Sequence, residues 1–389
     1  MLHNGNMIKD KFEDVFCLKN LYDAHIRGRR AKRSKRPIVT YELSLMYNLQ
    51  IMLDRILSGK YKVTKYHDFV VFEPKKRQIQ TLLYRDRVVQ HVLCDKLLAP
   101  YFTKRAILDN GVCQIGKGTH FTLDRLVKNT VKMIKREGTT DLYVLKCDIH
   151  KYFPSIPHEQ LKRKVLHHID DKRLRDFVAM VIDSYHTAPK YLVEHNIPFA
   201  EACGPHPFNP SMVTTGRGLP IGNQTSQIFG MFYLDTLDRF VKEKLRVKCY
   251  SRYMDDFILV HPDKLFLRNA LVQIKALLDD LGLQLNEKTK IFPLKNGIAY
   301  LGFKLYFYPT GKVVKKVARK TVKRFVAKAR LINYAFAHGL IKVERVKSTL
   351  AAYHGHLKHG NCRKLELKLF KLIKINEIYL QQRAERYGK

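Results

Sequence analysis

Three aspartates stand where the chain is expected to leave or enter β-strands. Asp255 and Asp256 lie in the sequence YMDD, between the strand-like runs CYSR and FILV, so we expect them at the tip of a β-hairpin. Asp148 follows another strand-like run, LYVLKC, much earlier in the chain. An Asp-Asp pair alone is most often a solvated turn. Three carboxylates from two strand ends, however, are what a two-metal phosphoryl-transfer site requires.

The chemistry of such a site explains the choice of side chain. In an in-line displacement at phosphorus, negative charge develops on the attacking and the leaving oxygens, and two divalent ions stabilise both. Mg²⁺ prefers hard oxygen ligands and keeps several waters, so a few carboxylates are enough. We expect Asp148 and Asp255 to bridge two ions, and Asp256 to tune the site or to bind more weakly.

The charge of the chain indicates a polyanionic partner. Its 389 residues carry 72 Lys and Arg against 35 Asp and Glu, a formal net charge of +37. Residues 288–343 hold fourteen Lys or Arg and no Asp or Glu. A charge run is most often a solvated face, but so long a window without acids favours a surface for a nucleic-acid backbone.

Other classes of protein are not indicated. No apolar run approaches the length of a membrane span and the N-terminus shows no secretion signal, so we expect a cytoplasmic protein without a membrane partner. Seven cysteines are scattered without a C-x-x-C pair. They predict reduced thiols, and neither a zinc site nor a disulfide framework.

The patterning predicts the elements that position the aspartates. Residues 1–39 form a basic N-terminal extension, whose Arg- and Lys-rich cluster favours RNA binding over a disordered tail. One helix is predicted for residues 40–57. Residues 187–216 carry five prolines and predict a surface loop or insertion. From about residue 315 the sequence predicts basic helices.

Four motifs in order resemble those of reverse transcriptases. The segments are KCDIHKYFPSI around Asp148, then YMDD, LNEKTK around Lys288, and YLGF at residues 300–303. They resemble the palm motifs of that family, and the last resembles its primer grip. The order of the four, more than YMDD alone, carries the resemblance.

Finer motifs are most similar to the bacterial branch related to group II introns. RDRVVQH and GKGTH resemble its finger motifs, and YHGHLK resembles its thumb. IGNQTSQ at residues 221–227 resembles a signature of diversity-generating retroelement reverse transcriptases, where many other members place Gln at the position of Ile221. Defence-associated bacterial reverse transcriptases have similar palms. The 187–216 loop and the long C-terminus depart from the compact pattern.

The resemblance implies an α+β fold of the right-hand polymerase type. Its fingers are expected at residues 40–145 and its palm, with an antiparallel sheet, at residues 146–308. The insertion at 187–216 is expected within the palm. Residues 309–389 are expected to form a basic helical thumb and a C-terminal extension.

The resemblance also implies roles for particular residues. Asp148, Asp255 and Asp256 are the expected catalytic and metal-binding residues, and the Ile149 carbonyl is a further expected ligand. The implied cofactor is two Mg²⁺ ions, for which Mn²⁺ can substitute. The residues implied for dNTP binding are Lys75, Arg77, Phe153, Ile221, Gly222 and Lys288.

Each nucleotide-binding residue has an ordinary structural alternative. Arg77 is expected to grip the triphosphate with Lys75 and Lys76 as helpers, although a basic surface turn has the same sequence. Phe153 is expected to exclude a ribose 2′-OH, whereas aromatic residues more often belong to a core. Ile221 is expected to contact the nucleotide without hydrogen bonds, and contact without polar readout discriminates poorly. Lys288 is expected either to assist pyrophosphate departure or to be solvated.

The implied function is an RNA-directed DNA polymerase that copies a dedicated RNA into cDNA, with errors at adenines, in a diversity-generating retroelement. Its expected partners are the RNA template, the DNA product, dNTPs, a structured non-coding RNA, and an accessory protein or oligomer, in a bacterial or phage-encoded system. One alternative is an antiviral defence enzyme that makes cDNA from a non-coding RNA. The other is a non-catalytic RNA-binding protein, against which the presence of all three aspartates argues.

Overall fold

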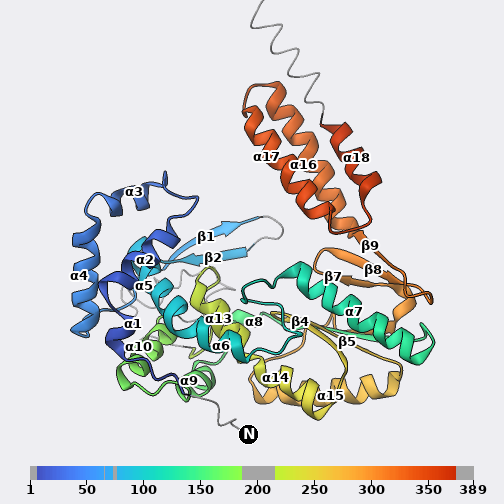
Figure 1. Cartoon of the computed structure of the whole chain (residues 1–389), viewed down its shortest axis with the longest axis horizontal. Coiled ribbons are helices and arrows are strands. Elements are labelled where there is room, and N and C mark those ends of the chain that lie inside the picture. The colour runs from blue at the N-terminus through green and yellow to red at the C-terminus, as the bar shows by residue number, and fades with distance from the viewer. Residues whose placement is uncertain (1–6, 65, 73–76, 186–214, 374–389) are drawn as a thin grey trace, which may run out of the picture.

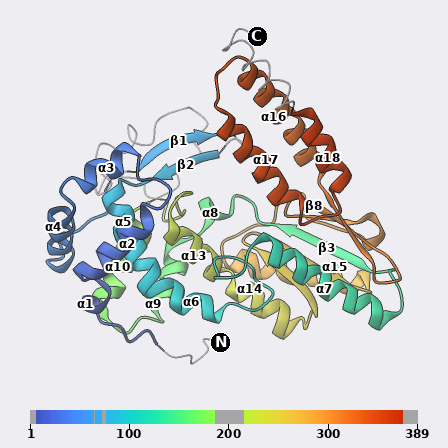
Figure 2. The same ribbon diagram turned by 45° about the horizontal axis from the view of Figure 1, so that its top comes forward.

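The chain folds as an α+β protein whose helices surround antiparallel sheets (Figures 1 and 2). The computed structural model describes residues 7–64, 66–72, 77–185 and 215–373. None of the helices in these ranges is long and apolar enough to cross a lipid bilayer. The cysteines in the same ranges are free. The expected insertion at 187–216 lies almost entirely outside the described residues.

A four-stranded antiparallel sheet forms the centre of the chain. Its strands are β3 (Tyr143–Asp148), β4 (Cys249–Tyr253), β5 (Asp256–His261) and β6 (Lys290–Pro293), in the order β4-β5-β3-β6. The hairpin predicted around YMDD and the strand predicted before Asp148 are confirmed. Side chains alternate along a strand, so β3 and β5 contribute to two cores: Leu145 and Leu259 to one, Val144 and Val260 to the other.

Helices cover both faces of this sheet (Figure 1). On the face that belongs to the first core, α15 (Lys264–Asp280) buries Leu267 and Ile274, whose spacing places them on one side of the helix. On the opposite face, α7 (Thr119–Glu137) buries Leu126 in the second core. Because both faces are packed, the positions of the strand ends are set by the interior of the protein.

The first core continues into a helical region, next to which lies a separate β-hairpin. The strands of the hairpin are β1 (His67–Val71) and β2 (Arg77–Thr81). The helices are α1 (Phe12–Val15), α2 (Leu18–Gly28), α5 (Tyr84–Val92), η1 (Leu93–Leu98), α6 (Ala99–Arg105), α8 (Tyr152–Ser155), α9 (His158–Leu166), α10 (Lys172–Asp183), α13 (Gln224–Tyr233), α14 (Asp235–Arg239) and η2 (Phe240–Lys244). The N-terminal extension is part of this core, since the Phe16 ring lies 4.5 Å from the Phe177 ring between centroids.

The single helix predicted for residues 40–57 is wrong. The structure has two helices, α3 (Arg36–Glu42) and α4 (Leu45–Leu57). Ser44 between them has φ −131° and ψ 46°, outside the helical region, and occupies the N-cap position of α4 without a capping hydrogen bond from its side chain. Pro37 lies in the first turn of α3, where its missing N–H costs no hydrogen bond. These two residues set boundaries that the apolar pattern does not reveal.

The C-terminal part combines a small sheet with three helices. The strands are β7 (Ile298–Tyr300), β8 (Phe303–Phe307) and β9 (Val313–Val317), which follow the short helix η3 (Leu294–Asn296). The helices are α16 (Arg319–Ala337), α17 (Val343–Leu357) and α18 (Arg363–Leu372). They confirm the predicted basic helices. They rise on the same side of the central sheet as the β1–β2 hairpin (Figures 1 and 2).

Candidate active site

The three aspartates come together at one end of the central sheet. Asp148 is the last residue of β3 and Asp256 is the first residue of β5, and the two are direct partners across the antiparallel pair. Asp255 occupies the turn before β5, and its carbonyl oxygen accepts a hydrogen bond from the Ile149 N–H (3.3 Å). Acids from two strand ends therefore lie together at one end of the sheet, in the arrangement that the sequence predicts.

A two-residue turn, Met254 and Asp255, joins β4 to β5. Tyr253 and Asp256 are strand partners, so the chain reverses within these two residues. Met254 has φ of +58°, in the left-handed region that short hairpin turns require and that residues with a side chain rarely adopt. Such a conformation costs about 1–3 kcal/mol and persists only where neighbouring contacts impose it.

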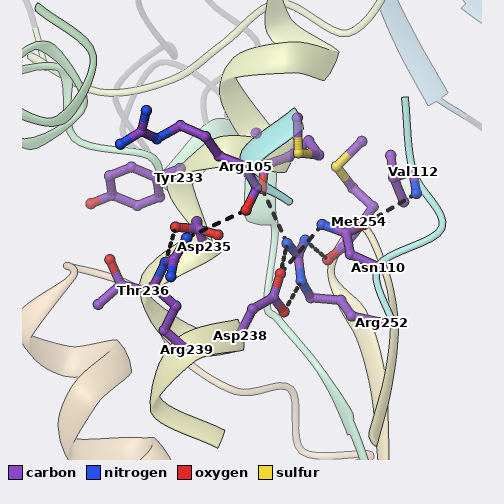
Figure 3. Close-up of polar contacts among 12 residues, drawn as sticks. Arg105, Asn110, Val112, Tyr233, Asp235, Thr236, Asp238, Arg239, Arg252 and Met254 are labelled. Atoms are coloured by element: carbon purple, nitrogen blue, oxygen red, sulfur yellow. Dashed lines mark hydrogen bonds and ion pairs between the residues drawn. The ribbon is translucent and has the colours of Figure 1, made fainter. Parts of the chain in front are cut away.

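Arg252, which directly precedes YMDD, supplies those contacts (Figure 3). Its Nη1 donates to the Met254 carbonyl oxygen (2.9 Å) and its Nη2 donates to the Met231 carbonyl oxygen (3.1 Å). Its Nε and Nη2 also donate to the two carboxylate oxygens of Asp238 in α14, at 2.7 and 2.6 Å. Both charged side chains are 0% exposed. The turn that carries Asp255 is therefore fixed by a buried ion pair.

Asp238 has additional donors on both oxygens. The Tyr250 hydroxyl donates to Oδ1 (2.7 Å), and Asn110 Nδ2 donates to Oδ2 (3.3 Å). A bidentate arginine with two further donors offsets the loss of water around a buried carboxylate. The loop containing Asn110 is bonded to β4 as well, because the Arg252 N–H donates to the Asp109 carbonyl oxygen (3.0 Å).

The charges of Asp255 and Asp256 at this end of the sheet have fewer compensating partners than the charge of Asp238. Burial, together with the charges of Asp148 and Asp255, raises the pKa of Asp256 to about 7, although Lys146, 3.5 Å from Oδ2, opposes the shift. Burial and the charge of Asp148 also raise the pKa of Asp255. The Oδ1 atom of Asp256 is buried and has no hydrogen-bond partner among the described residues. The site concentrates negative charge that a bound cation would neutralise.

The donor set fits a hard divalent cation. Asp148, Asp255 and Asp256 offer only oxygen ligands, which suit Mg²⁺ and Mn²⁺. Within the described ranges, no three Asp, Glu, His or Cys side chains already converge as a complete metal-binding group. A bound ion would take its other ligands from water, from backbone carbonyls such as that of Ile149, or from substrate, as Mg²⁺ commonly does.

The expected basic residues lie at different distances from this edge. Arg77 begins β2, is exposed, and lies near enough to Asp255 for its charge to oppose the burial-driven rise in the pKa of that carboxyl. Lys288 is exposed two residues beyond Asn286, whose N–H donates to a backbone carbonyl at the end of β3 (2.7 Å). Lys75 lies outside the described residues.

The other expected nucleotide-binding residues lie on either side of α13. Ile221 and Gly222 precede this helix and contact Gln80 of β2. Phe153 lies in α8 and is half-buried. A Cβ atom on Gly230 of α13 would come within 3.0 Å of its ring, so the ring packs directly on the backbone of that helix.

Sequence reasoning missed the residues that support the aspartates. Lys146 pairs with Asp256 from the neighbouring strand. The Tyr300 hydroxyl donates to the Asp256 carbonyl oxygen (3.2 Å), which ties the YLGF turn to the YMDD hairpin. Arg252 adjoins YMDD in the sequence, and a charged residue inside a strand-like run was the available signal. Asp238 gave no such signal, because it lies among other charged residues of a helix.

An antiparallel sheet with acidic residues at one edge, flanked by a projecting hairpin and basic helices, is the arrangement of a nucleotide polymerase. Residues 73–305 match the family model described as reverse transcriptase (RNA-dependent DNA polymerase). The match covers more than half of the chain, and the chain belongs to this family. It is therefore an RNA-directed DNA polymerase with a right-hand α+β fold, in a family that uses divalent metal ions, RNA templates and dNTPs. No curated protein matches the sequence.

Breaking the buried ion pair is expected to destabilise the protein strongly. Asp238→Ala leaves the Arg252 charge buried and unpaired, so the free energy of unfolding should fall by about 3–5 kcal/mol in chemical denaturation. The control Asp176→Ala removes an exposed carboxylate that pairs with Lys172 at the surface, and it should change stability little. Equal denaturation midpoints for the two variants would show that the buried pair adds no stability.

Proposed function

We propose that this reverse transcriptase extends a primer 3′ hydroxyl with dNTPs, using Asp148, Asp255 and Asp256 as catalytic residues and two Mg²⁺ ions as cofactors. The observation that carries the proposal is the placement of three aspartates at one end of two paired strands, with a buried Asp256 oxygen that has no partner among the described residues. Two ions bound at such a site stabilise the attacking and the leaving oxygens of an in-line displacement.

The three aspartates have different surroundings, and we assign them different roles. Asp148 and Asp255 would hold the ions, since one ends β3 and the other sits in the turn bonded to Ile149. Asp256 shares its charge with Lys146 and therefore tunes the site or binds an ion more weakly. The chain's part in the reaction is to hold these oxygens in place before substrate arrives, which lowers the cost of reorganisation during the chemical step.

The incoming nucleotide is proposed to lie between β2 and the aspartates. Arg77 stands at the start of β2, and its charge acts on Asp255. We propose that this cation binds the triphosphate of the incoming nucleotide. We assign Lys75 as a second cation near Arg77, and Lys288 as a cation beside the departing pyrophosphate. Ile221 and Gly222 form the apolar side of the nucleotide site.

Loss of one metal-binding carboxylate is expected to abolish synthesis. Asp255→Ala should lower Mg²⁺-dependent primer extension on an RNA template by about a thousandfold, because metal ions supply several kcal/mol of transition-state stabilisation. Asp280→Ala, which removes an exposed carboxylate at the end of α15, is the matched control and should extend primers normally. Near-normal extension by Asp255→Ala would contradict the assignment.

Phe153 is proposed to exclude ribonucleotides. Its carbonyl oxygen accepts a hydrogen bond from the Leu219 N–H (2.9 Å), and its ring rests on Gly230. The neighbouring Tyr152 hydroxyl donates to the Gly230 carbonyl oxygen (2.5 Å). Because these contacts fix the ring relative to α13, it cannot easily move aside for an additional 2′-OH.

The gate is tested by the ratio of kcat/KM for a dNTP to that for the matching rNTP. Phe153→Ala should lower this ratio by roughly tenfold or more, since a steric contact of this size is worth 1–3 kcal/mol. Phe153→Tyr keeps the ring and should keep the preference. An unchanged ratio in Phe153→Ala would remove the gate role.

The biological role that we propose is error-prone cDNA synthesis in a diversity-generating retroelement. Ile221 supports this role, because its side chain offers no hydrogen-bond donor or acceptor and its backbone N–H and C=O are both bonded to Gln80. A nucleotide site with an aliphatic side chain at this position reads base-pair shape with little polar discrimination. A structured RNA and an accessory protein complete the proposed assembly.

Sequencing the cDNA bound to the protein in cells that express its native locus tests this role. Active enzyme should yield cDNA altered mainly at template adenines, and Asp255→Ala should yield none. Faithful or repetitive cDNA from one structured RNA would replace the diversity-generating role with an antiviral one. RNA bound without cDNA in both samples would favour a binding protein.

A further inference from the structure

The segment that precedes and begins α13 is attached, at nearly every residue, to Tyr66 and β2 of the hairpin or to the helices α5 and η1. Four of the five positions in residues 221–225 form hydrogen bonds with residues far earlier in the chain. The partners are Gln80 for Ile221, Tyr66 for Asn223 (3.2 Å), Asp95 for Gln224 (3.2 Å) and Gln90 for Thr225 (3.1 Å). The segment proposed to face the nucleotide is therefore held mainly by residues outside the central sheet.

Gln80 makes the contact nearest to the proposed nucleotide site. Its backbone N–H donates to the Ile221 carbonyl oxygen (3.0 Å), and its side-chain Oε1 accepts from the Ile221 N–H (3.3 Å). Both backbone groups of Ile221 are therefore bonded to one residue. Gln80 is only 7% exposed, so its amide is a buried polar group with a specific partner.

Gly222 shows how closely the two segments approach. It has φ of +144°, and a Cβ atom there would lie 2.5 Å from the Gln80 carbonyl oxygen and 3.1 Å from Ile79 Cγ2. Only glycine permits this approach of two backbones. The main chains of β2 and of residues 221–225 therefore pack directly against each other at this junction, with no room for a side chain between them.

The same strand connects this junction to Arg77. Along β2 the residues change from exposed at Arg77 to buried at Gln80. A strand rises about 3.3 Å per residue, so roughly 10 Å separate the cation from the junction. A rotation of β2 about its buried end would therefore move the Arg77 guanidinium. Ile221 would move with the strand only while its hydrogen bonds to Gln80 are kept.

We propose that Gln80 is a positioning residue for nucleotide selection, whose side-chain carbonyl fixes the backbone of Ile221 against the strand that carries Arg77. The triphosphate cation and the apolar side of the nucleotide site then keep one relative position. The inference rests on the proposed roles of Arg77 and Ile221. An Ile side chain cannot hydrogen-bond, so its position depends on its backbone. The inference is that Gln80 holds that backbone in place.

Three variants of the full-length protein test the inference. Gln80→Met removes the acceptor at nearly constant size, and Gln80→Glu retains an acceptor oxygen. Gln78→Met makes the first change at an exposed residue two positions away on the same face of β2. Single-nucleotide incorporation on an RNA template with Mg²⁺ gives kcat, KM for the correct dNTP, and the ratio of correct to incorrect insertion. Thermal unfolding of each variant accompanies these measurements.

We expect Gln80→Met to raise KM for the correct dNTP roughly tenfold and to change the insertion ratio, because the Ile221 N–H loses its acceptor. Its kcat at saturation and its unfolding temperature should stay close to wild type. Gln80→Glu should restore KM, and Gln78→Met should match wild type.

Two results would overturn the inference in distinguishable ways. If the wild-type enzyme adds dNTPs normally but Gln80→Met keeps the wild-type KM and insertion ratio, or loses only kcat and thermal stability, Gln80 has no positioning role. If the wild-type protein itself incorporates no dNTP on any RNA template, the proposed function fails first and the inference fails with it.

Discussion

The active-site end of this reverse transcriptase depends on the ion pair between Arg252 and Asp238. Two charges without any exposure to water are stable only when their hydrogen-bonding capacity is filled. Here one arginine joins the strand β4, the helix α14, the Met231 carbonyl of α13 and the YMDD turn. The left-handed conformation of Met254 follows from this anchorage, since its carbonyl is bound from inside the protein.

The contrast between the two groups of acids explains how the site is prepared for its cofactor. Asp238 receives four side-chain hydrogen bonds and holds Arg252 in place. Asp256, at the start of β5, has Lys146 near one oxygen and a buried second oxygen without a partner among the described residues. The Arg252–Asp238 pair, whose charges are well compensated, thus holds the turn that carries Asp255 in place. The aspartates at this end of the sheet are less well compensated and remain available to a metal ion and its substrate.

The sequence predicted the central hairpin because its information is local. Two apolar runs separated by a short polar turn specify β4 and β5, and the aspartates follow from their place in that turn. The break at Ser44 was missed because an apolar pattern continues across it, while a single polar residue changes the backbone. The bond between Gln80 and Ile221 spans 141 positions, and no periodicity encodes which glutamine meets which backbone after folding. Long-range polar partners therefore needed the structure.

The central sheet is a wall shared by two cores, with Leu145 and Leu259 on one side and Val144 and Val260 on the other. The helices α16, α17 and α18 contribute only to the second core. When these helices loosen, α7 still covers the second-core face of the sheet and α15 still covers the first-core face. The amide hydrogens of these strands consequently exchange with solvent only when the sheet itself separates. We therefore expect the backbone that ends in Asp148 and the backbone that begins at Asp256 to exchange slowly.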